Sequence, residues 1–259
     1  MSESPGPLLG AEPLKGRVAL VTGAAHNIGR AITIAYADSG ADVVIHAHSS
    51  GGEAERLADE VRSRGRRAHV AVADVRDQAA VTSMVGAAVE SLGAINVLVN
   101  NAAVRKEAPF EELPVELWRE AIGVTLDGAF FCAQAVIGGM ISAGSGTIIN
   151  LVGLTAHTGA AQRAHVITAK SGIIGFTKAL AIEYADRGIT VNGVSPGTID
   201  TVRGESAGGA RPAHRQSRVV PIGRQGHPDE IAAMCVFLAS AQARYITGQI
   251  IAINGGAYV

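Results

Sequence analysis

The stretch that decides the fold is Val18-Ala19-Leu20-Val21-Thr22-Gly23-Ala24-Ala25-His26-Asn27-Ile28-Gly29-Arg30, near the start of the chain. Its first residues are apolar and include two valines, which indicates a buried strand. Apolar residues then recur at spacings of three and four from Gly29 to Ser39, which predicts a helix. Gly23 allows a tight turn between the two elements, and Gly29 allows the helix and the strand to pack closely. Backbone amides at the start of this helix are therefore expected to face a phosphate group.

The same alternation of strand and helix continues along the chain. Helical patterns include Gln78 to Leu92 and His165 to Tyr184, and short β-branched runs lie between such segments. These runs are almost continuously apolar, which is typical of strands covered by helices on both faces. About seven strands are predicted, at 18–22, 43–46, 68–72, 97–100, 146–151, 190–194 and 249–254. The fold class is therefore α/β, with a doubly wound parallel sheet between two helical layers.

Composition limits the domain organisation and the partners. The chain has 259 residues, of which 47% are hydrophobic and 17% charged, so we expect one domain over residues 16–259. A net charge of -1 gives no electrostatic reason to expect nucleic acid or an anionic membrane as a partner. Residues 1–15 contain three prolines and no apolar run long enough for a signal peptide, so we expect a disordered tail and a cytoplasmic protein. Cys132 and Cys235 are too far apart in sequence to suggest a metal site, and none is expected.

Three further motifs follow the later strands in order. Asp74-Val75 follows the third strand, Asn100-Asn101-Ala102-Ala103 the fourth, and Ser195 to Thr201 the sixth. With the glycine turn and with Lys170 on a helix, this order resembles the short-chain dehydrogenase/reductase family from Gly16 to Val259. The resemblance implies a Rossmann-like fold and a nicotinamide cofactor. The cofactor-binding residues expected on this basis are Gly23, Ala25, His26, Asn27, Ile28, Gly29, His48, Ser49, Asp74, Val75, Asn101, Ala102, Lys170, Pro196, Gly197, Ile199 and Thr201.

Two details of the cofactor motifs bear on the nucleotide. Asn27 replaces the middle glycine of the family's loop, and asparagine adopts unusual backbone angles more readily than most residues. An acidic residue roughly 20 positions past the loop would bind the adenosine ribose, and the matching position is Ala47. Without a carboxylate there, His26, His48 and the adjacent serines offer donors to a 2′-phosphate. NADP(H) is therefore preferred, and NAD(H) stays possible.

The catalytic positions depart from the family more strongly. In the family a tyrosine exchanges a proton with the substrate, a serine binds the substrate carbonyl, and a helix asparagine anchors a proton-relay water. The resemblance places these side chains at positions 166, 153 and 125, where this chain has Val166, Gly153 and Thr125. Lys170 is retained. The resemblance therefore implies an oxidoreductase with a non-standard proton donor.

Substitutes for the missing groups lie nearby in the sequence. Lys170 can donate directly if desolvation lowers its pKa. His157 and His165 titrate in a useful range, although His165 is expected to project to another side of its helix. The candidate catalytic residues are Lys170, Thr125, Thr155, Arg163, His157 and His165.

The segment from Thr201 to Val220 resembles the family's mobile substrate lid. It carries Arg203, Arg211, Arg215 and Arg218, which favour an anionic small-molecule substrate, although a solvated loop has the same composition. The apolar helices at 115–141 and 162–184 and the C-terminus resemble the elements through which family members form tetramers. We therefore expect a homotetramer or homodimer, although the same faces also suit a core.

Three functions fit these observations. The first is an NAD(P)(H)-dependent oxidoreductase acting on a small carbonyl, alcohol or activated alkene. The second is a catalytically silent protein that binds nucleotide as a sensor or as a partner subunit. The third is redox-neutral, lyase-type chemistry on the same fold, with Lys170 or a histidine moving a proton.

Overall fold

The computed structural model describes residues 10–202 and 219–259. Seven strands form a single sheet of order β3-β2-β1-β4-β5-β6-β7, and every neighbouring pair is parallel. The strands are β1 (Val18–Val21), β2 (Asp42–Ala47), β3 (Ala68–Val72), β4 (Val97–Asn100), β5 (Gly146–Leu151), β6 (Ile189–Pro196) and β7 (Ile250–Ile253). The predicted doubly wound parallel sheet is confirmed.

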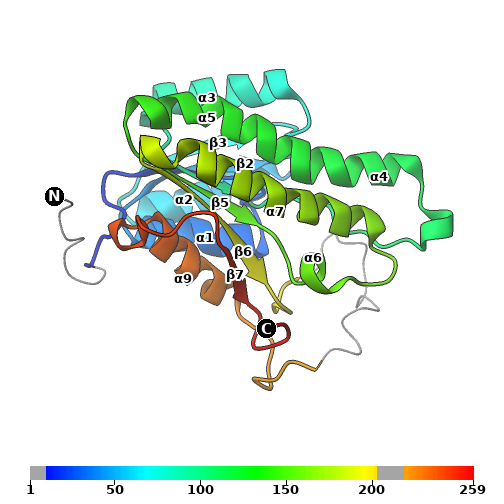
Figure 1. The fold of residues 1–259 in the computed structure, drawn as a ribbon. Helices are drawn as coiled ribbons and strands as arrows, with labels where there is room; N and C mark the ends of the chain where they lie inside the picture. Colours follow the sequence, from blue (N-terminus) through cyan, green and yellow to red (C-terminus); the bar gives the residue numbers. More distant parts are fainter. Residues whose placement is uncertain (1–9, 203–218) are drawn as a thin grey trace.

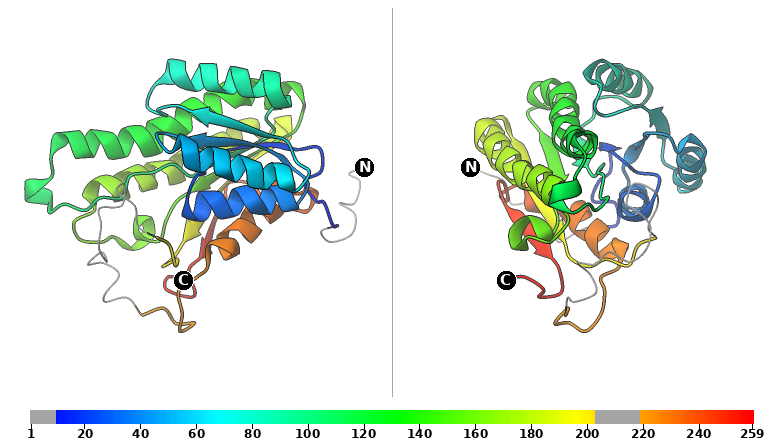
Figure 2. Two further views of the ribbon diagram at one scale, coloured as in Figure 1. Left: turned by 180° about the vertical axis from the view of Figure 1, so that it is seen from behind. Right: turned by 90° about the vertical axis from the view of Figure 1, so that its right-hand side faces the viewer.

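Helices cover both faces of this sheet (Figures 1 and 2). One layer contains α1 (Asn27–Asp38), α2 (Gly51–Ser63) and α9 (Pro228–Ala239). The other contains α3 (Gln78–Leu92), α4 (Val115–Ile122), α5 (Gly128–Ser142) and α7 (Ala164–Tyr184). The short helix α6 (Thr155–Thr158) and the turns η1 (Phe110–Glu112), η2 (Gly123–Asp127), η3 (Ala185–Arg187) and η5 (Ala241–Ala243) complete the described elements. The sheet thus lies between two separate apolar clusters, one under each helical layer.

Local sequence signals explain where several helices begin. The Asp77 carboxylate accepts hydrogen bonds from Ala79 N and Ala80 N, which caps α3. A capping box of His227 and Glu230, with Pro228 at the first helical position, starts α9. These contacts fix where each helix leaves its loop.

The strand order places the carboxyl ends of β1 and β4 side by side at the point where the chain reverses its direction across the sheet. Strands β2 and β3 extend from β1 on one side, and β5 to β7 extend from β4 on the other. A crevice at such a reversal is the usual ligand site of doubly wound sheets.

The disordered tail predicted over residues 1–15 extends too far, because its last residues pack on the domain. Leu14 is fully buried in the cluster beneath α1, and its amide donates a hydrogen bond of 2.9 Å to Ser39 O. Burial of one leucine and one backbone hydrogen bond tie this part of the tail to the domain. Residues 1–9 lie outside the described part of the chain.

A continuous helical run, Val115–Ser142, combines α4, η2 and α5. Its length and its mean hydropathy of 1.5 would suit a membrane-crossing helix, by length and composition alone. In this fold α5 packs on α3 and α4 on α7, and Cys132, Val136 and Met140 are buried in the core. Core packing therefore accounts for part of the apolar character of this run.

Candidate functional site

The glycine turn after β1 requires glycine at two positions. Gly23 has a φ of 61°, in the left-handed region. A Cβ atom on Gly29 would lie 2.3 Å from Gly23 O and 2.7 Å from Asn101 Nδ2. The turn and the start of α1 therefore approach each other as closely as a backbone allows, which leaves the α1 amides accessible to a ligand.

Asn101 holds this turn in place. Its side-chain Nδ2 donates to Thr22 O at 2.8 Å and to Gly23 O at 3.0 Å. In return, Thr22 Oγ1 accepts hydrogen bonds from the amides of Asn101 and Ala102. The ends of β1 and β4 thus form one rigid unit, and the Asn101 amide supports the turn.

Asn27 adopts a left-handed conformation, with a φ of 51°, which asparagine tolerates better than most residues. Its Nδ2 donates to Val202 O at 2.8 Å, and its Oδ1 accepts from Val202 N at 2.9 Å. Asn27 therefore joins the glycine turn to the chain that follows β6, a contact that the family's glycine at this position has no side chain to make.

His46 is a contributor that sequence reasoning missed, although a histidine inside an apolar strand was a signal. Its Nδ1 lies 3.1 Å from Gly23 N and accepts a hydrogen bond from it, and its Nε2 lies 3.0 Å from Ala73 O. This pattern places the ring proton on Nε2. Burial lowers the pKa of His46, which keeps the ring neutral and holds the glycine turn against β2.

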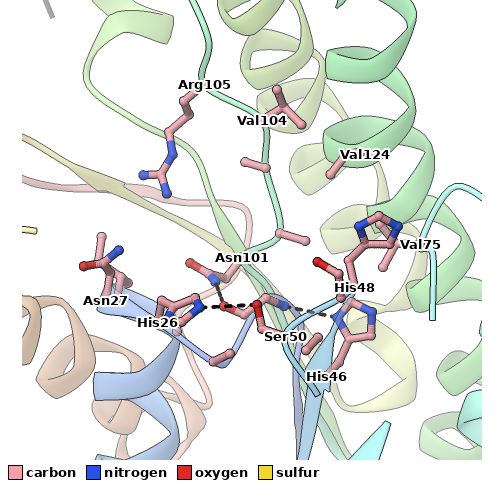
Figure 3. Close-up of a pocket in the computed structure, with 18 of the residues that line it drawn as sticks. His26, Asn27, His46, His48, Ser50, Val75, Asn101, Val104, Arg105 and Val124 are labelled. Atoms are coloured by element: carbon pink, nitrogen blue, oxygen red, sulfur yellow. Dashed lines mark hydrogen bonds between the residues drawn. The ribbon is translucent and has the colours of Figure 1, made fainter. Parts of the chain in front are cut away.

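These elements border a cavity of about 660 Å³ at the carboxyl ends of β1, β2 and β4 (Figure 3). It contains predicted residues of the glycine turn, of the end of β2 and of the segments after β3 and β4. These are Gly23, Ala25, His26, Asn27, Ile28, Gly29, His48, Ser49, Asp74, Val75, Asn101 and Ala102. Residues absent from the predicted set also line it: Arg30, His46, Ala47, Ser50, Arg76, Ala103, Val104, Arg105, Glu120, Val124 and Val202. A cavity of this size suits a cofactor.

One end of the cavity is rich in polar side chains. Asp74 accepts hydrogen bonds from Arg76, the shortest at 2.6 Å, and these bonds hold the pKa of Asp74 below its ordinary value. His48 Nε2 lies 3.8 Å from Asp74 Oδ2, and His26 Nε2 lies 3.4 Å from Ser50 Oγ. Arg76 follows β3 and lines the cavity together with Ala47 and His48 at the end of β2. The sequence analysis did not predict it as a site residue.

Lys170 is buried on α7, and its Nζ donates to Leu151 O at the end of β5. Burial lowers its pKa to about 7, with further lowering by the positive charges of Arg105 and Arg163. Both protonation states are therefore populated at neutral pH. The sequence analysis expected Lys170 to act as a proton donor if desolvation lowered its pKa, and its pKa is lowered in this way.

Of the three other catalytic positions of the family, two carry no hydroxyl in this chain and the third is a threonine. Val166, four residues before Lys170 on α7, is 3% exposed. Gly153 has a φ of 150°, which an L-residue rarely adopts, and a Cβ there would meet nothing within 4 Å. Thr125 is buried in the π-helical turn η2. Lys170 thus remains the titratable group at this set of positions.

All of the candidate catalytic residues lie outside the cavity lining: Lys170, Thr125, Thr155, Arg163, His157 and His165. His165 is fully buried and its Nε2 lies 3.0 Å from Lys106 O, so packing accounts for its ring. His157 stacks on Tyr258 with ring centroids 5.2 Å apart. Arg163 Nη1 lies 3.9 Å from Glu107 Oε1, and Thr155 begins α6.

The predicted residues after β6 also lie outside this lining. Pro196 ends β6, and a Cβ on Gly197 would lie 2.6 Å from Asn254 Cα, so close packing on the end of β7 explains this glycine. Ile199 is buried and Thr201 Oγ1 donates to its carbonyl at 3.5 Å. Arg203, Arg211, Arg215 and Arg218 lie outside the described residues.

Comparison with known proteins agrees with this architecture. Residues 23–258 match the family model described as enoyl-(acyl carrier protein) reductase. The chain is 38% identical over 246 residues to a 3-oxoacyl-(acyl-carrier-protein) reductase from Vibrio harveyi, which covers 95% of this chain and 99% of that relative. The chain belongs to the short-chain dehydrogenase/reductase family. Members of this family are oxidoreductases that use nicotinamide nucleotides, so this chain is an oxidoreductase of that family.

Two further relatives extend the comparison. A D-threitol dehydrogenase from Mycolicibacterium smegmatis is 40% identical over 245 residues, which cover 94% of this chain and 93% of the relative. A solved short-chain dehydrogenase/reductase from Serratia marcescens matches with a TM-score of 0.87 at 34% identity, over 95% of this chain and all of that one. The named activities of these short-chain dehydrogenases differ, so family membership alone does not identify a substrate.

Proposed function

We propose that this protein is an NADP(H)-dependent oxidoreductase for a small carbonyl, alcohol or activated alkene, with Lys170 as the proton donor and acceptor. The observation that carries the proposal is Lys170 itself, buried on α7 with a pKa of about 7. A group that titrates near the working pH is well suited to general acid and base chemistry.

The cavity fits a dinucleotide phosphate. Gly29 leaves space that any side chain would fill, so the amides of the turn and of the start of α1 can bind the diphosphate. Ala47 brings no carboxylate to the adenosine ribose, while His26, His48, Ser50 and Arg76 line the same region and offer donors to a 2′-phosphate. NADP(H), when bound, supplies or accepts the hydride. Comparing the dissociation constants of NADPH and NADH tests this preference, and tighter NADH binding would refute it.

Lys170 moves the proton in this proposal. In the reducing direction its ammonium gives a proton from Nζ to the substrate as negative charge develops there. In the oxidising direction the neutral amine takes the proton back. The hydrogen bond to Leu151 O orients Nζ, and burial removes competing water. Part of the transition-state stabilisation that serine and tyrosine supply elsewhere in the family therefore falls to one cation.

Substitution of Lys170 tests the mechanism. The assay follows nicotinamide absorbance with a panel of aldehydes, ketones and activated alkenes. Lys170→Met should lower kcat by about 100-fold or more, the usual effect of removing a general acid. The wild-type pH profile should show an inflection near pH 7, from the pKa of about 7, that the variant lacks. Lys178→Met, at an exposed lysine of the same helix, is the matched control. Full activity of Lys170→Met would refute the assignment.

The same experiment separates the other two functions. Tight cofactor binding without turnover of any substrate, together with a co-purifying second subunit, would identify a catalytically silent protein. Product formation without a change in nicotinamide absorbance would identify redox-neutral chemistry.

The location and assembly of the protein belong to the same proposal. Short-chain dehydrogenase activity on small metabolites fits the cytoplasm, where the two thiols of Cys132 and Cys235 stay reduced. Exposed apolar side chains on α5 and α7, including Phe130 and Ile182, fit a homodimer or homotetramer.

A further inference from the structure

Arg105 carries a positive charge into the cavity, and neither the family motifs nor the proposed proton transfer account for it. It follows β4 by five residues and lines the cavity together with Asn27, Gly29 and Asn101. Figure 3 shows its guanidinium pointing into the cavity toward the side on which Asn27 and Asn101 lie. His46 and His48 lie on the opposite side of this view, whereas His26 lies next to Asn27 on the side of Arg105.

The segment that carries Arg105 is fixed to the start of α7. Ala108 N donates to Gln162 O at 3.0 Å, and Lys106 O lies 3.0 Å from His165 Nε2. The two segments therefore form one wall, which brings Arg105 toward the helix that carries Lys170. A rigid wall of this kind holds a charged side chain in a defined position.

Positive charge gathers along this wall. Lys170 and Arg163 are both buried on α7 or at its start, and the fields of Arg105 and Arg163 both reach Lys170. Glu107 lies 3.9 Å from Arg163 and offsets part of that charge. Of these three cations, Arg105 is the one that lines the cavity. A substrate with negative charge is therefore favoured beside Arg105 over a neutral one.

We propose that the substrate is an oxo acid or the corresponding hydroxy acid, and that Arg105 binds its carboxylate while the reacting carbonyl faces Lys170. This inference rests on the oxidoreductase function proposed above and names its substrate class. The planar guanidinium can bind both carboxylate oxygens at once, which fixes the carbonyl in one orientation. At position 153 the chain has no serine to do so.

Binding of the carboxylate also acts on the proton donor. The negative charge cancels the field of Arg105, and thereby raises the proton affinity of Lys170. An oxo acid therefore increases the fraction of the ammonium form that protonates it. A neutral ketone in the same position has no such effect. The charged groups that act on Lys170 in this account are Arg105 and Arg163, with Glu107 next to the latter.

Matched substrate pairs test the proposal. NADPH oxidation is measured with pyruvate and methyl pyruvate, and with acetoacetate and its ethyl ester, for wild type, Arg105→Gln and Arg105→Lys. Arg105→Gln should lower kcat/KM for the acids by about 10- to 100-fold, as for loss of a charge-assisted bidentate contact, and change the esters less than about threefold. For Arg105→Lys, kcat/KM for the acids should lie between the values of wild type and Arg105→Gln. The control is Arg56→Gln, at an exposed arginine of α2. An equal loss for acids and esters, or no loss, would overturn the inference.

Two binding measurements separate the sources of failure. Calorimetric titration of the NADP⁺ complex with malonate tests the anion site without turnover, and Arg105→Gln should weaken binding by about tenfold or more. Retained, Arg105-dependent malonate binding with no turnover of any substrate would refute the oxidoreductase function and leave the carboxylate site standing. Turnover of esters alone, without Arg105-dependent malonate binding, would support the oxidoreductase function and refute the carboxylate site. If Arg105→Gln instead weakens NADPH binding and leaves malonate binding unchanged, the anion is the cofactor diphosphate and the substrate inference is wrong.

Discussion

Lys170 is the side chain on which the proposed proton transfer depends. Val166 lies four residues before it and Gly153 lies two residues after the end of β5, so neither of these two positions offers the lysine a hydroxyl. Burial, together with Arg105 and Arg163, gives it a pKa of about 7. These observations support the proposed role of Lys170 in proton transfer.

The depressed pKa of Lys170 also predicts a pH-dependent stability. The unfolded chain binds the proton up to about pH 10.5 and the folded chain only up to about pH 7, so stability rises with pH between these values. The difference in unfolding free energy between wild type and Lys170→Met should therefore shift in favour of wild type by about 2 kcal/mol or more from pH 7 to about pH 9.5. Urea unfolding at both pH values measures it. If the unfolding free energies of the two proteins changed with pH in parallel, the lowered pKa of the buried Lys170 would be contradicted.

Gly153 gives a second prediction at this scale. Because its φ of 150° is disfavoured for an L-residue, Gly153→Ala should destabilise the protein by about 1 to 3 kcal/mol although the space is open. Gly138→Ala, on the exposed face of α5, should instead stabilise it by about 0.5 to 1 kcal/mol. Thermal unfolding of the two variants checks the contrast. It also indicates that restoring serine at position 153 would strain the backbone.

At the scale of elements, the site depends on hydrogen bonds between the ends of three strands. His46 at the end of β2 connects the glycine turn after β1 with Ala73 after β3, and Asn101 after β4 holds the same turn from the other side. The turn is therefore shaped by its neighbours as much as by its glycines.

His46 should make this junction sensitive to acid. Its folded pKa lies below the ordinary value, so stability is complete above about pH 6.5 and is lost as the pH falls through the folded pKa. His48 and Asp74 act on the same ring in opposite directions, and burial dominates. His46→Leu should cost about 2 to 4 kcal/mol at pH 7, because Gly23 N and Ala73 O each lose a partner. This cost should shrink toward pH 5, as urea unfolding would show. If His46→Leu lost the same unfolding free energy at both pH values, or if the control His69→Asn behaved like it, the role of His46 in joining the strand ends would be refuted.

The sequence predicted the elements well because their signals are local. The run from Gln78 to Leu92 and the strands after it are recognisable by period and composition, and the glycine turn by its spacing. His46, Arg76, Arg105 and Val202 were missed, because their roles depend on which segments meet at the edge of the sheet. His157 and His165 were singled out by residue type, and only the fold reveals their packing against Tyr258 and Lys106 O.

For the whole molecule, we propose a homodimer or homotetramer, and the exposed apolar side chains support this proposal. Ile182 on α7 is 83% exposed and Phe130 on α5 is 43% exposed, in the helical layer that also holds α4. Light scattering after size exclusion should give the mass of a dimer or tetramer. Phe130→Glu combined with Ile182→Glu should yield a smaller species, while Val89→Glu on α3 serves as the control at a comparably exposed site. A wild-type monomer would refute the assembly.

The bridge from Asn27 to Val202 joins residues 175 positions apart, and Tyr36 on α1 donates to Cys235 O on α9 across 199 positions. A ribosome makes the glycine turn among the first residues of the chain, yet Val202, which binds Asn27 in that turn, is made only after more than three quarters of the chain. Contacts of such long range form late in folding. The nucleotide site is therefore expected to mature last, so that a growing or truncated chain cannot sequester cofactor and nucleotide binding reports that the whole sheet has assembled.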